Sequence, residues 1–442
     1  MGKTAPVWFL AASLVLLAAG CGGGGGGSSS PSSADQALLD QIALNIPGGV
    51  AGLTMPDPSD LPAIPQDPNN PLTAEKVALG RLLYHETALL TNPIKPQGLG
   101  SASCASCHNA QGGFSAGRFQ GLGEGGRGFG FSGEARHEDP AYAPTEVDSQ
   151  PVKSPSTLNS AYQPNLHWNG ELGSGGLNAG TQGQWMPGTP TELNNLGYQG
   201  VETQAIAALR IHRMGFGKPL SDSLGYTALF DAAFPTVPPI DRYSDITVGL
   251  ALAAYERTLL ATRSPWQRWL RGDFSAMTEV QKRGAGLFFG KAECWKCHSG
   301  PALTDGKFHA IGLNGLDKIG IANNAGPAAP ENLGRGGFTK NVTALYQFKT
   351  PQLYNLADTS YYGHGASFTK LAELIQYKNL GIPQSPLLPP GGPDPLFHPL
   401  GLSVQEVDAI AEFLQNALRD PELLRYVPSS TLSGHPFPNN DP

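Results

Sequence analysis

The stretch Cys104-Ala105-Ser106-Cys107-His108 recurs in the second half of the chain as Cys294-Trp295-Lys296-Cys297-His298. Both stretches have the pattern Cys-x-x-Cys-His, and together they contain all but one of the 5 cysteines in the sequence. This pattern is typical of c-type haem attachment, in which two thiols bind the porphyrin and the adjacent histidine ligates the iron. The sequence therefore predicts two covalently attached haem groups, with His108 and His298 as proximal iron ligands.

Other uses of paired cysteines fit this arrangement less well. A structural zinc site would bring its second cysteine pair roughly 15–20 residues after the first, whereas these pairs lie in different halves of the chain. A thioredoxin-like dithiol needs no following histidine and lies in a βαβ unit, which the sequence does not indicate. Disulfides are compatible with an exported protein, but they would not explain His108 and His298.

The beginning of the chain has the features of an export signal. Lys3 precedes an apolar run, residues 7–19, that is too short for a comfortable transmembrane helix. Cys21 follows small residues, as in a bacterial lipoprotein cleavage site, although Ala18 stands where such sites usually have a larger aliphatic residue. We expect acylation of Cys21, the alternative being a free cysteine in an ordinary signal peptide. The Gly/Ser-rich stretch 22–33 would then tether a periplasmic protein to the outer membrane, with no other membrane contact.

Length and charge restrict the organisation and the class of partner. A chain of 442 residues exceeds the usual size of a single hydrophobic core, so two domains are expected. We predict a signal peptide at 1–20, a tether and N-terminal extension at 21–71, a first haem domain at 72–235, a second at 236–430, and a tail at 431–442. The formal net charge of -7 argues against nucleic-acid binding, which requires clustered Lys and Arg.

The hydrophobic pattern predicts a mainly α fold: two cytochrome c-like haem domains with long Gly/Pro-rich loops and few strands. Apolar residues at helical spacing predict helices over 72–84, 202–214, 246–262, 278–289, 369–378 and 404–418. Ser403 and Glu406 form a capping box at the start of the last of these. Glycine and proline concentrate in loops at 112–133, 170–200, 312–337 and 381–392. No segment shows the sustained alternation that indicates strands.

The distal ligand of each iron decides between electron transfer and peroxide chemistry. A methionine ligand raises the reduction potential and suits electron transfer, but all 5 methionines precede Cys297. If the second haem takes its distal ligand from the C-terminal part of the chain, that ligand is His or Tyr, or the position is open. Tyr377 is a candidate, since an axial Tyr occurs in catalase. From its spacing on the predicted helix alone, core packing is the better interpretation of Tyr377.

Several further segments accompany the two motifs in a fixed order. They are Leu79-Gly80-Arg81-Leu82-Leu83-Tyr84, Ser154-Pro155-Ser156-Thr157-Leu158-Asn159, His167-Trp168-Asn169-Gly170, Ala254-Tyr255-Glu256-Arg257-Thr258-Leu259, Leu303-Thr304-Asp305-Gly306-Lys307-Phe308-His309, Phe348-Lys349-Thr350-Pro351-Gln352-Leu353 and Tyr362-Gly363-His364. In content and order they resemble the bacterial dihaem cytochrome c peroxidase and MauG family. The resemblance extends over most of the predicted mature sequence.

The resemblance implies roles for individual residues. The first haem would be the peroxidatic one, with an open or weakly filled distal side, and the second would transfer electrons. Trp168 would match the tryptophan that relays electrons between the two haems. Tyr377 would match the axial tyrosine of the MauG-type branch. Gln204 resembles the distal glutamine of the family.

One position departs from the family pattern. About ten residues after the distal glutamine the family has a glutamate next to a methionine, whereas here Met214 is preceded by His212 and Arg213. His212 is our candidate for proton transfer, since the unperturbed pKa of histidine lies near neutrality. The family also has an interdomain calcium ion, for which we assign no residues.

Three functions follow from these observations. The leading prediction is a dihaem peroxidase that reduces hydrogen peroxide with electrons from a small cytochrome or cupredoxin. The second is a MauG-type oxidase that uses peroxide to oxidise Trp or Tyr side chains of a partner protein. The third is a dihaem electron carrier without catalysis, in which both irons would be six-coordinate.

Overall fold

The computed structural model describes residues 30–441, and the predicted signal peptide and Cys21 lie outside this range. The described chain is mainly helical, which confirms the predicted fold class. Its α-helices are α1 (Ser33–Asn45), α2 (Ala74–His85), α3 (Gly200–Ile211), α4 (Lys218–Leu224), α5 (Thr227–Ala233), α6 (Asp245–Arg257), α7 (Pro265–Leu270), α8 (Glu279–Phe289), α9 (Gly334–Thr339), α10 (Leu371–Leu380) and α11 (Val404–Glu412). The six predicted helices correspond to α2, α3, α6, α8, α10 and α11, and the capping box at Ser403 is present.

The strands are few and short. β1 (Gly126–Arg127) pairs with β2 (His137–Glu138), and β3 (Phe308–His309) pairs with β4 (Phe348–Lys349), both antiparallel. No helix within residues 30–441 is long and apolar enough to cross a membrane.

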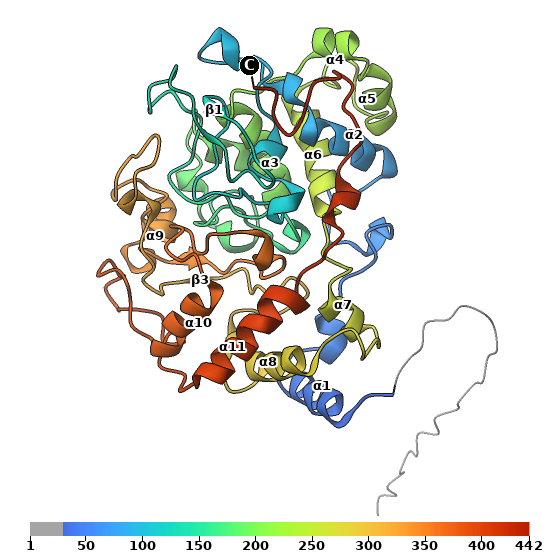
Figure 1. Cartoon of the computed structure of the whole chain (residues 1–442). Helices are drawn as coiled ribbons and strands as arrows, with labels where there is room; N and C mark the ends of the chain where they lie inside the picture. The colour runs from blue at the N-terminus through green and yellow to red at the C-terminus, as the bar shows by residue number, and fades with distance from the viewer. Residues whose placement is uncertain (1–29, 442) are drawn as a thin grey trace, which may run out of the picture.

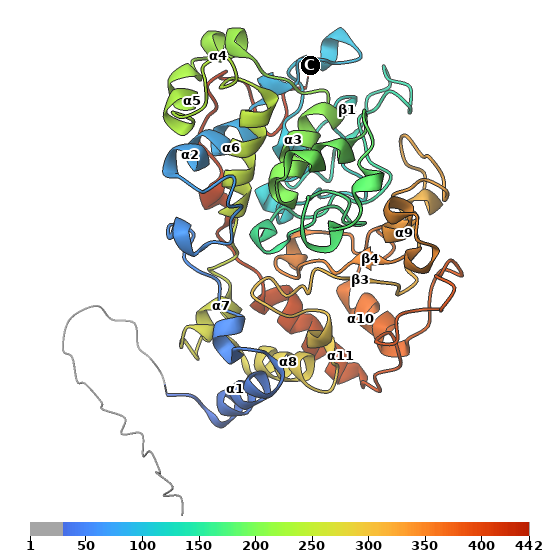
Figure 2. The same ribbon diagram turned by 180° about the vertical axis from the view of Figure 1, so that it is seen from behind.

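The helices form two groups (Figure 1). Helices α2 to α6 lie together at the top of this view, and α1, α7, α8, α10 and α11 lie at the bottom. The view from behind shows the same separation (Figure 2). The C-terminal segment leaves the lower group and returns to the upper one.

Each group contains a pair of helices whose backbones come into close contact at a glycine. A side chain at Gly80 of α2 would clash with the carbonyl oxygen of Ala251 in α6. In the same way, a side chain at Gly284 of α8 would clash with the carbonyl oxygen of Ala409 in α11. The two halves therefore use the same packing solution, in which a missing Cβ lets two backbones approach.

This packing gives a stability prediction with a control on the same helix. We expect Gly284→Ala to destabilise the protein by about 1–3 kcal/mol, because the added methyl group forces α8 and α11 apart. A Cβ at Gly286 would meet no atom within 4 Å. Gly286→Ala should therefore stabilise α8 by about 0.5–1 kcal/mol, since alanine is the better helix former. Thermal unfolding of both variants checks the prediction, and equal effects would contradict it.

Contacts cross the predicted domain boundaries. Helix α6 begins after the predicted boundary at 235/236 but packs against α2 and α3 of the first half. Helix α1, from the predicted N-terminal extension, packs against α8, and Asn45 donates a hydrogen bond to the Phe289 carbonyl oxygen at 2.7 Å. The domain boundaries remain a prediction. Each predicted segment within residues 30–441 packs with one of the two halves of the chain that contain a Cys-x-x-Cys-His motif.

The predicted C-terminal tail contacts the first motif. The hydroxyls of Ser103 and Ser106 both donate to the carbonyl oxygen of Pro438, at 2.7 and 2.6 Å. The Asn440 amide donates to the Ser101 carbonyl oxygen at 2.9 Å. The end of the chain is therefore fixed beside the first Cys-x-x-Cys-His stretch, although the two are far apart in sequence.

Candidate functional site

One cavity of about 530 Å³ is lined by residues from both halves of the chain. Both Cys-x-x-Cys-His motifs contribute to its wall through their cysteines and histidines. The predicted catalytic residues Trp168, Gln204 and His212 also line it. The fold thus brings all the predicted site residues except Tyr377 to a single cavity.

The two motifs have the same local structure. The first motif forms a 3-10 turn over Cys104–Ser106, and the second forms one over Cys294–Lys296. In each turn the histidine amide donates to the carbonyl oxygen of the first cysteine, at 3.0 Å for His108 and 2.8 Å for His298. The turn therefore holds both cysteines and the histidine of each motif close together, and all of them line the cavity.

The chemistry of these side chains fits haem attachment. The four cysteines are free thiols, and burial raises the pKa of Cys104 to about 12 and that of Cys107 to about 11. Burial lowers the pKa of both His108 and His298 to about 4, so both rings are neutral and able to ligate a metal. The Nδ1 atom of His298 donates to the Leu303 carbonyl oxygen at 3.0 Å, which leaves Nε2 for iron.

Trp168 is held by backbone groups from both halves of the chain. Its indole Nε1 donates to the Lys153 carbonyl oxygen at 2.8 Å, and its own carbonyl oxygen accepts from the Lys349 amide at 2.8 Å. The His364 ring lies edge-on to the indole, with ring centroids 6.1 Å apart. A residue of the first half is thus positioned by Lys349 and His364 of the second half.

His212 faces the cavity, whereas its neighbour Arg213 does not. The Nδ1 atom of His212 lies 2.9 Å from the Asp148 carboxylate, and Arg213 is bound to Glu124 at 2.6 Å. Burial lowers the pKa of His212, but the charge of Asp148 and its hydrogen bond together raise it above the ordinary value. Gln204 lies on α3 two turns before His212, and it lines the same cavity. The position that departs from the family pattern is therefore a His–Asp pair at the cavity wall.

Tyr377 does not line the cavity in this structure. Its hydroxyl donates to the Ile311 carbonyl oxygen and accepts from the Gln384 amide at 3.3 Å. Its ring packs against Phe368 and Phe397, at centroid distances of 5.3 and 5.1 Å. Ligation of iron by Tyr377 stays a prediction, and it requires the hydroxyl to leave these two backbone partners.

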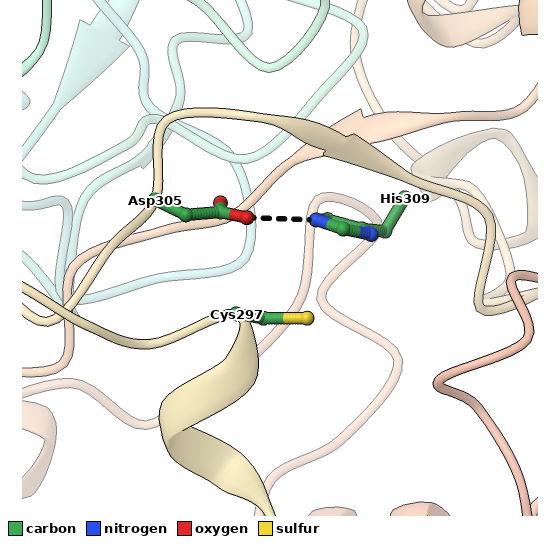
Figure 3. A group of neighbouring side chains, drawn as sticks. All are labelled: Cys297, Asp305 and His309. Carbon is green, nitrogen blue, oxygen red and sulfur yellow. Dashed lines mark hydrogen bonds and ion pairs between the residues drawn. The ribbon is translucent and has the colours of Figure 1, made fainter. Parts of the chain in front are cut away.

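One cluster near the second motif has the composition of a metal site (Figure 3). Cys297, Asp305 and His309 place their sulfur, oxygen and nitrogen atoms within 4.8 Å of one another. Both His309 nitrogens already face carboxylates, Nε2 at 3.1 Å from Asp305 and Nδ1 at 2.7 Å from Asp394. The hydrogen bonds to Asp305 and Cys297 raise the pKa of His309 to about 11, although burial opposes them. Calcium takes oxygen ligands, whereas this cluster offers a thiol and an imidazole beside one carboxylate, so its composition does not match a calcium site.

Glu256 is a buried acid in the cavity wall that the sequence did not single out as functional. It is 4% exposed, and one of its carboxyl oxygens has no hydrogen-bond partner within residues 30–441. Burial raises the pKa of Glu256 to about 8, and the charge of Glu202 adds to this shift while Arg257 opposes it. The carboxyl group is therefore neutral at pH 7.

The raised pKa gives a pH-dependent stability. In the unfolded chain the carboxyl ionises near its ordinary pKa of 4.5, while in the folded chain it stays protonated up to about pH 8. Wild type therefore loses folding free energy as the pH rises through this window, whereas Glu256→Gln has no such loss. We expect the variant to gain thermal stability relative to wild type between pH 5 and pH 8. A difference that does not change with pH would contradict the assignment.

Comparison with known proteins identifies the family. The family model described as di-haem cytochrome c peroxidase matches residues 74–275. The methylamine utilization protein MauG of Methylorubrum extorquens is 32% identical over 328 residues, which cover 74% of this chain and 74% of MauG. The chain belongs to the dihaem cytochrome c peroxidase and MauG family. Cytochrome-c peroxidase IdrP1 of Denitromonas iodatirespirans is 29% identical over 377 residues, covering 80% of this chain and 84% of IdrP1.

A solved structure agrees with this assignment. The crystal structure of a MauG-like protein associated with microbial copper homeostasis matches with a TM-score of 0.52 and 25% identity, covering 80% of this chain and 92% of that one. Membership of the dihaem peroxidase family makes the chain a peroxidase-type oxidoreductase with haem c as its cofactor.

Besides Glu256, sequence reasoning missed three residues that line the cavity: Asp148, Lys153 and Lys349. Asp148 lies far from His212 in sequence, so no local pattern could pair them. Lys153 and Lys349 are buried, although lysine is ordinarily a surface residue. Lys349 belongs to the segment Phe348-Lys349-Thr350-Pro351-Gln352-Leu353, whose resemblance to the family was the one sequence feature that could have pointed to it.

Proposed function

We propose that this protein reduces hydrogen peroxide at a haem attached to Cys104 and Cys107 and ligated by His108. A second haem, attached to Cys294 and Cys297 and ligated by His298, would receive electrons and pass them on. The observation that carries the proposal is that both motifs line one cavity together with Trp168. When bound, the haem irons supply the redox chemistry that cleaves the O–O bond.

The cavity side chains provide the protons and the electron path. Reduction of one peroxide to two waters consumes two electrons and two protons. His212 would exchange a proton at Nε2, since its Nδ1 atom bonds the Asp148 carboxylate. Gln204 would orient the peroxide from the same helix. Trp168, fixed by backbone bonds from both halves, would carry electrons from the second haem to the first.

We further propose a periplasmic location and a small redox protein as electron donor. A c-type haem protein with an export signal needs a donor in the same compartment, and a small cytochrome or cupredoxin fits. Acylation of Cys21 would tether the protein to the outer membrane through the Gly/Ser-rich stretch. Globomycin treatment of expressing cells, which blocks lipoprotein signal-peptide cleavage, would leave an unprocessed precursor if this is right.

A MauG-type oxidase of a partner protein is the second candidate function. Two observations favour it: the 32% identity to MauG and the absence of a methionine after Cys297. In that case Tyr377 would ligate the second iron, and Trp or Tyr side chains of a partner protein would be oxidised.

Spectra of the haem-loaded protein, for wild type and Tyr377→Phe, test both functions. For the peroxidase we expect one equivalent of peroxide to be consumed only after one-electron reduction by a small cytochrome, with Tyr377→Phe unchanged in its optical and EPR spectra. A long-lived oxidised form that arises from the diferric protein and is lost in Tyr377→Phe would instead establish the MauG-type function. Two six-coordinate low-spin haems that do not react with peroxide would contradict both functions and would indicate an electron carrier.

A further inference from the structure

Two lysines that form backbone hydrogen bonds with Trp168 have their side chains buried in the wall of the haem cavity. Lys153 is 6% exposed and Lys349 is 7% exposed. Both residues line the cavity, and both use backbone groups to hold Trp168. Buried lysines of this kind are rare unless an acidic group pairs with them.

Neither lysine has an acidic partner within residues 30–441. The Lys153 ammonium donates to the Ser115 hydroxyl at 2.8 Å and weakly to the Ser154 carbonyl oxygen at 3.5 Å. The Lys349 ammonium donates to the Gln163 side-chain oxygen at 2.6 Å and to the Asn165 carbonyl oxygen at 2.7 Å. An ammonium has three donors, so each lysine keeps at least one for a further acceptor.

Burial without a counter-charge is costly for both ammonium groups. Burial alone lowers the pKa of Lys153 to about 8 and that of Lys349 to about 7. All the protein partners of the two ammonium groups are neutral oxygens. An anion in the cavity would keep both lysine side chains protonated, and it would accept the remaining hydrogen bond of each ammonium group.

We propose that Lys153 and Lys349 form a binding site for the carboxylate groups of the bound haems. Haem c has two propionate carboxylates and no other anionic side groups, so it supplies the acceptors that these lysines lack. The inference rests on haem occupancy of the cavity, as in the proposed function, but not on peroxide turnover. It makes the two lysines positioning residues that fix the haem carboxylates beside Trp168.

The arrangement also has a consequence for the reduction potentials. A positive charge in a region of low dielectric favours the reduced haem, which carries one positive charge fewer than the oxidised form. Removal of a lysine leaves a carboxylate unpaired, which further disfavours the reduced form. Lys153 and Lys349 would therefore raise the potential of the haem that each one contacts.

Spectroelectrochemical titration of the haem-loaded protein tests the proposal with Lys153→Met and Lys349→Met. For each variant we expect the equilibrium constant for reduction of one haem to fall about tenfold or more, which corresponds to 59 mV for one electron. Lys153→Arg and Lys349→Arg keep the charge, so their reduction potentials should shift by less than a third of that amount. Lys370→Met removes the same charge from an exposed side chain and serves as the control, since solvent screens it.

The outcomes separate this proposal from the proposed function. Potentials that move no further in Lys153→Met and Lys349→Met than in Lys370→Met would overturn it, and so would equal shifts in the Arg and Met variants. If one Met variant does not fold, the other lysine gives an independent result. If the wild type holds haem but reduces no peroxide, the proposed function fails while the potential shifts still decide the lysine assignment.

Discussion

Replacing both Cys104 and Cys107 by alanine is expected to reduce the covalent haem content by half and to abolish peroxide reduction. The two thiols lie in one 3-10 turn of the cavity wall, with His108 fixed directly after them. Without the thioether bonds the proposed peroxide-reactive haem would lose its covalent link to the chain, and we expect His108 alone to hold it too weakly to survive purification. Haem-stained gels, pyridine haemochrome spectra and peroxide consumption measure the effect.

The second motif provides the matched control. Cys294→Ala with Cys297→Ala should also leave half of the haem, but it should spare the peroxide-reactive haem and remove the entry of electrons from the donor. Binding of small ligands such as cyanide should therefore persist in this variant and be lost in the Cys104/Cys107 variant. The reverse pattern would show that the roles of the two haems are exchanged.

His212→Asn is expected to lower the rate of peroxide reduction by about a hundredfold to ten-thousandfold, the range for loss of a general acid–base group. Asparagine can still form a hydrogen bond with Asp148 but cannot exchange a proton. The control is His137→Asn, since His137 is exposed and bonds the Ala135 carbonyl oxygen outside the cavity. A His212→Asn variant with the wild-type rate would mean that Gln204 and water suffice for proton transfer.

Asp148→Asn tests how the pair sets the pH dependence. Burial lowers the pKa of His212, but the charge of Asp148 and its hydrogen bond raise it overall. Without the carboxylate charge the pKa of His212 should fall, so the limb of the pH–rate profile that reports His212 should move to lower pH. A limb that stays in place would assign the titration to another group.

The helices and the haem motifs could be read from the sequence because both depend on local chemistry. Apolar residues at helical spacing must form one face, so α2, α3, α6, α8, α10 and α11 were predictable. The role of the Cys-x-x-Cys-His stretches was predictable, because haem c attachment requires two thiols and a histidine within one turn. Trp168 and Gln204 came from the family resemblance, and His212 came from the position at which the chain departs from the family pattern. The structure places all three at one cavity.

The tertiary structure alone decided how these parts meet. Glycines at α2 and α8 were visible in the sequence, but only the packing shows which backbones they admit. Asp148 reaches His212, and Lys349 reaches Gln163, across separations that no local pattern links. Tyr377 has the sequence position of a ligand, yet its hydroxyl bonds a backbone carbonyl. The sequence by itself determined the cofactor chemistry and the helical fold, because these depend on residue type and spacing. The tertiary structure determined the charges around the cavity, because burial and long-range contacts exist only in the folded chain.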